Sequence, residues 1–278
     1  MRLHILLLLS IFSSENLLAQ TDTLIFKNCT SRLQVYGDSI LKGSTDTVRM
    51  NAHQQFFELI DSILHTPGGS QLSFGQYKAL SVALSDDEKV KAITWLVQTD
   101  RGNKYRYYGY LLQRKEKKDD WQVHRLEMNN QLQRDLLETL KSDSANWPGC
   151  IYYAVHHERY KKKDYYLLLG WAPQSVQTTR KYIEPLGLTP TRITVGTPSI
   201  KAGGRARTRL VFEYNAQLTM SLRYNEKLNM IVMDHLSSSD PRPEAKGMYQ
   251  LYGPDLSYDG LKFSKGQWVL VKDVDVRN

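Results

Sequence analysis

The sequence contains few of the residues, and none of the short motifs, on which familiar active sites are built. Its 278 residues include two cysteines and seven histidines. The Gly-x-Ser-x-Gly elbow of serine hydrolases, the His-Glu-x-x-His pair of zinc proteases and the Gly-x-x-x-x-Gly-Lys phosphate loop are absent. The sequence therefore predicts no cofactor and no metal site, and nucleic acid is not an expected partner.

A long apolar run is also missing. Met1 and Arg2 precede an apolar stretch from Leu3 to Phe12, which is followed by a short polar stretch and a small residue, Ala19. The apolar stretch is shorter than the roughly 20 residues of a membrane-spanning helix, and the layout is typical of a secretory signal. We expect residues 1–19 to be cleaved off, which leaves an exported chain without a membrane span.

The two cysteines leave two alternatives open. In an oxidising compartment Cys29 and Cys150 would pair, and the long loop closed by this bond would stabilise the fold by on the order of 4 to 5 kcal/mol. Alternatively, both are small buried hydrophobic residues, because an even count does not establish proximity. A catalytic role is not expected, since no histidine or basic residue lies beside Cys150 to lower the pKa of its thiol.

Composition indicates a folded, basic protein. A hydrophobic content of 41% is incompatible with a disordered chain, and the formal net charge is +8. Such a charge favours an anionic partner, but the basic residues are scattered along the chain. The densest cluster surrounds Lys162, where the sequence predicts the tip of a hairpin.

The chain after the signal divides into two regions of different pattern, residues 20–148 and 149–278, which could also pack as one domain. The first mixes helix and strand, and the second is almost entirely strand. The predicted fold class is α+β, predominantly antiparallel β, with a mixed N-terminal half and a C-terminal antiparallel meander or barrel-like sheet.

Three helices are predicted. The first begins at Asn51, a capping residue with Gln54 three positions later, and ends at the Pro67-Gly68-Gly69 break. The second begins near Asn130, where four leucines repeat at helical spacing, and the third covers residues 176–186. The predicted strands cover residues 90–98, 105–113, 121–128, 151–158, 165–171, 209–214, 218–224, 228–235, 260–263 and 267–271.

Three stretches of the second region carry a resemblance. They run from Tyr165 to Trp171, from Arg209 to His235, and from Tyr252 through Asp259 into the last predicted hairpin. This C-terminal half resembles a family of uncharacterised exported proteins from Gram-negative bacteria. The resemblance implies export and a β-rich fold. For the exported chain we expect a location in the periplasm or at the cell surface. It implies no activity and no catalytic residues.

Histidines and aspartates supply the only candidates for catalysis. His156-His157-Glu158 lies on a predicted strand, where neighbouring side chains point to opposite faces, so only two of the three can converge and a zinc site is not expected. Asp255 and Asp259 flank a predicted loop over residues 252–260, and His235 ends a strand. Together with His156 they are candidates for a hydrolase, although Gly-Pro-Asp and Asp-Gly are also ordinary turn sequences.

Tyrosine is abundant, with seventeen in the chain. Tyr105, Tyr107, Tyr152 and Tyr165 are candidates for binding, together with Lys162, because aromatic rings with polar tips suit sugar rings and partner surfaces. Half-buried strands of any β protein use tyrosine in the same way, so packing is the alternative.

Asp followed by Ser or Thr and then an aliphatic or small residue occurs five times, all in the first half of the sequence. The triplet resembles the acceptor pattern for O-linked glycans on exported proteins of some Gram-negative bacteria, and Thr23, Ser39 and Thr47 are the candidate acceptors. The match at Ser62 falls inside a predicted helix and is therefore better explained by coincidence.

These observations favour an exported, non-enzymatic binding or scaffold protein of the envelope, whose partner is an envelope protein or a glycan. A secreted hydrolase that uses the candidate Asp and His residues is the alternative, and binding of a polyanion or glycan by a basic, Tyr-rich surface is the second alternative. Geometry distinguishes them, because an enzyme needs these groups in one concave pocket.

Overall fold

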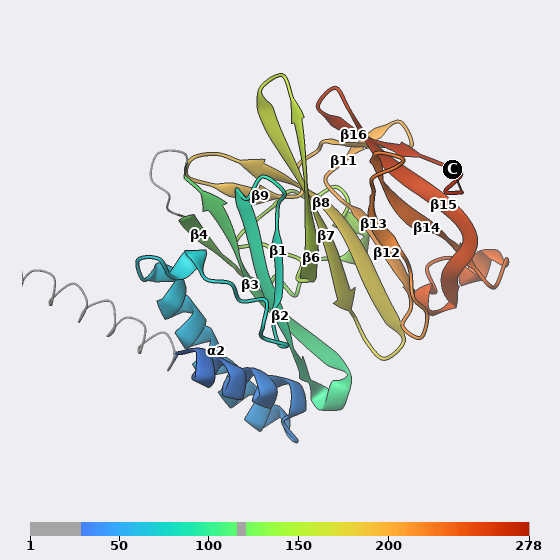
Figure 1. The fold of residues 1–278 in the computed structure, drawn as a ribbon. Helices are drawn as coiled ribbons and strands as arrows, with labels where there is room; N and C mark the ends of the chain where they lie inside the picture. The colour runs from blue at the N-terminus through green and yellow to red at the C-terminus, as the bar shows by residue number, and fades with distance from the viewer. Residues whose placement is uncertain (1–28, 116–120, 278) are drawn as a thin grey trace, which may run out of the picture.

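The computed structural model describes residues 29–115 and 121–277 (Figure 1). The predicted signal at residues 1–19 and the candidate acceptor Thr23 lie outside this part of the chain. The fold is α+β with mostly antiparallel sheets, as the sequence predicts. No helix of the described residues is long and apolar enough to cross a membrane.

Two consecutive helices form one outer layer. Residues 29–42 are helical, which the sequence analysis did not predict, and α2 follows over Asp46–His65. The helix α2 begins before the predicted Asn51, because the side chain of Thr45 caps it by accepting a hydrogen bond from the backbone N–H of Val48 at 3.2 Å. Its predicted end is confirmed, since Gly68 follows in the left-handed conformation.

The N-terminal sheet contains four antiparallel strands in chain order: β1 (Ser81–Leu84), β2 (Val90–Thr99), β3 (Lys104–Arg114) and β4 (Trp121–Leu126). The predicted hairpin of β2 and β3 is confirmed. Both faces of β2 are buried: Ile93 and Trp95 pack with the helices, whereas Val90 and Ala92 pack with the next sheet.

The central sheet holds six strands: β5 (Ser142–Asp143), β6 (Ile151–Tyr160), β7 (Lys163–Pro173), β8 (Thr178–Leu188), β9 (Ile193–Val195) and β12 (Leu210–Asn215). The predicted β6–β7 hairpin is confirmed, with Lys161 and Lys162 in the left-handed conformation at its turn. The helix predicted over residues 176–186 is wrong. Strand β8 takes its place. It pairs with β7 along one edge and with β9 and β12 along the other, and both of its faces are buried.

The C-terminal sheet also has six strands: β10 (Ile200–Ala202), β11 (Arg205–Arg207), β13 (Leu222–Asn225), β14 (Met230–Ser238), β15 (Tyr252–Ser264) and β16 (Gln267–Val271). The predicted closing hairpin is confirmed as β15–β16. The predicted three-strand meander is divided between sheets, because β12 pairs with β8 while β13 and β14 pair with each other. The predicted loop over residues 252–260 forms the first part of β15.

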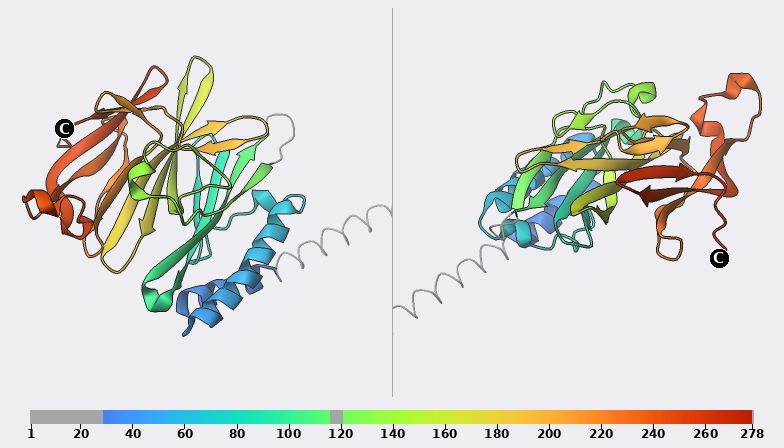
Figure 2. Two further views of the ribbon diagram at one scale, coloured as in Figure 1. Left: turned by 180° about the vertical axis from the view of Figure 1, so that it is seen from behind. Right: turned by 90° about the horizontal axis from the view of Figure 1, so that it is seen from above.

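Three hydrophobic cores separate these layers. One lies between the helices and the N-terminal sheet, the second between the N-terminal and central sheets, and the third between the central and C-terminal sheets. Strand β7 shows how the sequence divides between them, since Tyr166 and Leu168 enter the second core while Leu167 and Leu169 enter the third. Figure 2 shows the helices on one side of the molecule and the C-terminal sheet on the other.

The segment between β4 and β6 is not the helix predicted from Asn130. One short 3-10 turn, Arg134–Leu136, is the only helical structure there, and Leu136 and Leu140 are exposed. The guanidinium of Arg209 explains the difference, because it is fully buried and donates to the carbonyl oxygens of Leu137 and Leu140. Arg209, which directly precedes β12 and lies 69 positions after Leu140, thus binds carbonyl groups that a helix would otherwise use. The other 3-10 turns of the described chain are Gly69–Gln71, Asp100–Gly102, Pro243–Ala245 and Tyr249–Leu251.

Both cysteines are free thiols in the structure. Cys29 is half-buried beside the core under the helices, whereas Cys150 is fully buried in the core between the N-terminal and central sheets. Of the two alternatives, the structure shows two unpaired cysteines packed as small hydrophobic residues. Burial raises the pKa of the Cys150 thiol well above its usual value, which makes a thiolate there unfavourable.

Candidate functional site

A concave site lies between two hairpin tips and the loop that leaves the central sheet. We name it the hairpin cavity. Its volume is about 390 Å³, and its walls come from β7, the β8–β9 region, residues 197–199 and the start of β16. The two tips, β6–β7 and β15–β16, stand side by side at the top of Figure 1. Residues that line the cavity include Lys163, Asp164, Tyr165, Tyr166, Gly187, Leu188, Thr194, Thr197, Ser199, Gly266 and Trp268.

A glycine sets the width of the cavity between the two hairpin tips. Gly266 has a φ of +82°, which few other residues adopt, and a Cβ atom there would lie 2.8 Å from the hydroxyl oxygen of Tyr165. The ring of Tyr165 packs on Phe263 with a centroid separation of 5.1 Å. Tyr165 is therefore held at the wall of the cavity by its neighbours on β15 and β16.

Three residues with hydroxyl groups also line the cavity. They are Thr194, Thr197 and Ser199, and the hydroxyls of Thr197 and Ser199 lie 3.2 Å apart. Each hydroxyl can both donate and accept a hydrogen bond. A cavity lined by an aromatic ring and several hydroxyls is suited to a ligand that has apolar patches between polar groups.

A cluster of charged groups adjoins the cavity at Asp164, and we name it the rim cluster: Asp87, Lys89, His157 and Asp164. His157 Nε2 lies 3.0 Å from Asp164 Oδ1 and 3.6 Å from Asp87 Oδ2. The ammonium of Lys89 lies 3.1 Å from Asp164 Oδ2 and 3.7 Å from Asp87 Oδ2. Three elements thus converge here: the β1–β2 turn, β6 and β7.

Hydrogen bonds hold the two carboxylates of the rim cluster in place. Burial would raise the pKa of Asp87, but hydrogen bonds from the hydroxyls of Ser85, at 2.7 Å, and Tyr166, also at 2.7 Å, lower it below its usual value. The pKa of Asp164 is likewise lowered, because hydrogen bonds from His157 and Lys89 outweigh its burial. Both carboxylates are therefore ionised at neutral pH.

Three of the four predicted catalytic residues come together elsewhere, at a β-bulge between β14 and β15. His235 Nδ1 lies 2.9 Å from Asp259 Oδ2, and the charge of His235 contributes to the lowered pKa of Asp255, after the hydrogen bonds from Ser257. The fourth, His156, is not part of this group. It is buried between the central and C-terminal sheets, stacked on Tyr224 and 3.2 Å from Glu158.

The bulge lacks the arrangement of a hydrolase triad. The hydroxyl of Ser257 donates to Asp255 at 2.7 Å. Leu256 adopts a φ of +72° with 89% of its surface exposed, which is an unusual conformation for a residue with a branched side chain. Strained residues and bulges occur often at functional sites, so this edge of the C-terminal sheet is a second candidate.

The tyrosines that were candidates for binding lie in different environments. Tyr107 and Tyr152 are buried core residues, so neither ring can meet a ligand, and packing is their role. Tyr105 is half-buried against the same core, whereas Tyr165 lines the hairpin cavity. Lys162 is exposed on the turn beside that cavity, as predicted for a hairpin tip.

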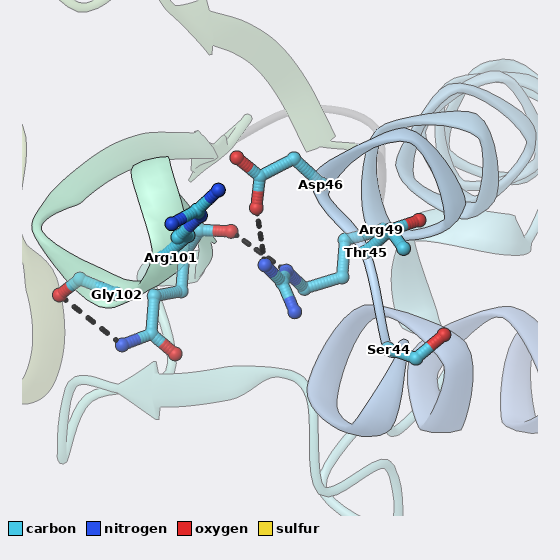
Figure 3. Close-up of a pocket in the computed structure, with 7 residues that line it drawn as sticks. Ser44, Thr45, Asp46, Arg49, Arg101 and Gly102 are labelled. Carbon is cyan, nitrogen blue, oxygen red and sulfur yellow. Dashed lines mark hydrogen bonds and ion pairs between the residues drawn. The ribbon is translucent and has the colours of Figure 1, made fainter.

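A further hollow of about 510 Å³ lies between the start of α2 and the β2–β3 turn (Figure 3). Two arginines line it, Arg49 and Arg101, and Arg49 is already used internally: it contacts Asp46 and donates to the carbonyl oxygens of Gly43 and Gln98. Asp46 also accepts a hydrogen bond from the backbone N–H of Asp100 at 2.7 Å. This hollow is a junction that fixes the helix to the sheet.

No sequence pattern indicates Asp87, Lys89 and Asp164 as site residues. In the sequence they look like ordinary turn residues, and the hydrogen bonds that join them span 75 positions from Lys89 to Asp164 and 79 from Asp87 to Tyr166. The strand alternation that separates His156 from His157 is correct, since the ring of His156 stacks on Tyr224 and that of His157 stacks on Tyr166. Alternation within one strand cannot reveal partners from other elements.

No protein-family model, no curated protein and no solved structure matches the chain. The geometry of these sites is therefore the basis on which a function can be argued.

Proposed function

We propose that the mature chain is an exported, non-enzymatic binding protein that holds a saccharide in the hairpin cavity. The observation that carries the proposal is the position of Tyr165 in the lining of a concave site that Thr194, Thr197 and Ser199 also line.

A saccharide matches both parts of this lining, the aromatic ring and the hydroxyl groups. The C–H face of a sugar ring packs on an aromatic ring, while its hydroxyls exchange hydrogen bonds with protein hydroxyls and backbone groups. A volume of about 390 Å³ lies within the range of roughly 300 to 1,000 Å³ typical of small-molecule sites. Lys161, Lys162 and Lys163 at the adjoining hairpin tip favour a saccharide that carries anionic groups.

The test is binding to an array of oligosaccharides from bacterial envelopes, including peptidoglycan fragments and lipopolysaccharide core sugars. The wild-type chain should bind at least one of them. Tyr165→Ala should lower the affinity about fivefold or more, because stacking on an aromatic ring contributes on the order of 1 kcal/mol or more.

Tyr249→Ala is the matched control. Tyr249 is another partly exposed tyrosine, but it belongs to a 3-10 turn that packs on β12 and does not line the cavity. This variant should bind like the wild type. Failure of the wild type to bind any oligosaccharide, or equal binding by Tyr165→Ala, would refute the proposal.

A hydrolase at the bulge is the second candidate, because His235 and Asp259 form the hydrogen-bonded pair that general acid–base chemistry requires. Screening the purified chain against ester, peptide and glycoside substrates tests it. Activity that His235→Gln abolishes and Tyr165→Ala leaves intact would favour this candidate over saccharide binding.

Export is part of the proposal and has its own test. Expression in a Gram-negative host followed by N-terminal sequencing should give a mature chain that begins at Gln20, outside the cytoplasm. Intact mass of that chain also tests for glycans on Ser39 and Thr47. Thr47 is exposed in the first turn of α2, whereas the Ser39 hydroxyl donates to the carbonyl oxygen of Val35 within the preceding helix.

A further inference from the structure

The rim cluster brings together three side chains that could ligate a metal ion. Asp87, His157 and Asp164 each offer one ligand atom, and these atoms lie within 4.8 Å of one another. Two donors that share a Zn²⁺ ion at about 2.0 to 2.2 Å, in tetrahedral geometry, lie roughly 3.4 Å apart. The distances of 3.0 and 3.6 Å from His157 Nε2 to the two carboxylates match this spacing.

The groups around these ligands are those that a metal site requires. Ser85 and Tyr166 each donate a hydrogen bond to Asp87, one to each carboxylate oxygen, and they leave lone pairs free for an ion. The backbone N–H groups of Lys89 and Val90 both lie within hydrogen-bond distance of the Ser85 hydroxyl, which fixes the turn that carries Asp87. Such outer hydrogen bonds orient metal ligands and tune their affinity.

A cationic group already occupies this place. The Lys89 ammonium lies within 3.7 Å of both carboxylates, and Arg159 Nε lies 3.7 Å from Asp164 Oδ1. The Lys89 side chain is 40% exposed and extends from a turn, so it can move into solvent when a competing ion arrives. Exposed ion pairs of this kind are weak, which makes the exchange feasible.

We propose that Asp87, His157 and Asp164 bind one Zn²⁺-class divalent ion, which displaces the ammonium of Lys89. One imidazole and two carboxylates are a ligand set that suits Zn²⁺, and a fourth position remains for water or a ligand. Asp164 and Tyr166 also line the hairpin cavity, so the ion would lie at its edge. The metal site does not depend on saccharide binding.

The experiment is a titration of the tag-free mature chain with Zn²⁺ in competition with a colorimetric zinc chelator. One ion per chain should bind. His157→Gln and Asp164→Asn should each weaken the affinity by more than about tenfold, since loss of an outer partner alone costs 10- to 100-fold. His235→Gln is the matched control, because it removes a histidine that pairs with one aspartate at a distant bulge, and it should leave Zn²⁺ binding unchanged.

Lys89→Gln makes the test independent of folding defects. If the ammonium competes with the ion, this variant should bind Zn²⁺ severalfold more tightly, and a misfolded chain would not produce such a gain. Absence of saturable binding by the wild type would overturn the proposal. So would binding that His157→Gln and Asp164→Asn leave unchanged, or weaker binding by Lys89→Gln.

Discussion

Two of the charge clusters in the described part of the chain differ in their access to solvent. Arg209 and Glu184 form an ion pair at 2.6 Å with both side chains 0% exposed. In the rim cluster, His157 and Asp164 form a pair at 3.0 Å with side chains 16% and 24% exposed. Similar chemistry therefore serves different purposes in the two places.

The buried pair has no capacity left for a ligand. Arg209 donates to Glu184, to the hydroxyl of Ser142 and to backbone carbonyls, while the second oxygen of Glu184 accepts a hydrogen bond from Tyr152 at 2.5 Å. In the rim cluster, by contrast, three ligand atoms lie within 4.8 Å of one another, and the Lys89 ammonium that pairs with Asp164 belongs to a side chain that is 40% exposed. Saturated and buried charges stabilise a fold, whereas convergent and accessible charges can bind.

The largest expected effect comes from breaking the buried pair. Arg209→Met leaves the Glu184 carboxylate buried without its partner, and we expect the free energy of unfolding to fall by about 3 to 5 kcal/mol. Urea denaturation measures this. The double variant Arg209→Met/Glu184→Gln should recover part of the loss, because no buried charge then remains, and a loss below about 1 kcal/mol in the single variant would show that the pair is not a structural centre.

The next largest effect concerns a buried histidine, which makes the free energy of unfolding depend on pH. Burial, helped by the charge of Arg106, lowers the pKa of His53 from 6.5 to about 4, and its Nδ1 accepts a hydrogen bond from the Trp95 indole at 3.2 Å. The folded state thus disfavours the charged imidazole, so the stabilisation is complete above pH 6.5 and is lost as the pH falls towards 4.

Between these pH values the free energy of unfolding should fall by on the order of 3 kcal/mol on account of His53. Thermal or urea denaturation at a series of pH values tests this. His53→Gln keeps a hydrogen-bond acceptor and does not titrate, so its stability should depend less on pH over that window. An unchanged pH profile in this variant would assign the acid sensitivity to other groups.

In the rim cluster, replacement of a charged residue by a neutral one should change the free energy of unfolding only slightly. Asp164→Asn breaks ion pairs whose members are partly exposed, and we expect the free energy of unfolding to change by no more than about 1 kcal/mol. Urea denaturation beside Arg209→Met makes the comparison direct. If both variants lost similar stability, the distinction between a structural and a binding cluster would fail.

The smallest effect is expected at the bulge. Leu256→Asn replaces an exposed residue in the left-handed conformation with one that tolerates it, and stability should rise by about 0.5 kcal/mol. A loss of stability would show that the Leu256 side chain makes contacts that its exposure does not suggest.

Local sequence patterns predicted most hairpins. The wrong predictions arose where tertiary contacts outweighed the local pattern. The turns after residue 99, at Lys161-Lys162 and at Gly266 have characteristic turn residues, and the strands beside them were predicted correctly. In β8 the apolar spacing indicated a helix, although Pro185 inside that stretch was a signal against one.

Buried polar groups explain what the sequence alone could not show. The leucines between Asn130 and Leu140 repeat like a helix, but Arg209 binds the carbonyl oxygens of that segment. The rim cluster likewise cannot be recognised in the sequence, since its members come together only when β1, β6 and β7 are folded side by side. His235 and Asp259 could be foreseen as candidates, whereas their pairing followed from the register of β14 and β15.

The most direct test of the central claim, that ligand binding takes place at the hairpin cavity, is amide chemical-shift mapping by NMR. The mature chain is titrated with the oligosaccharide that binds most strongly on the array. We predict the largest shifts at Gly187, Thr197, Ser199 and Gly266. Shifts centred on His235 and Leu256, with the cavity residues unchanged, would contradict the account and place binding at the bulge.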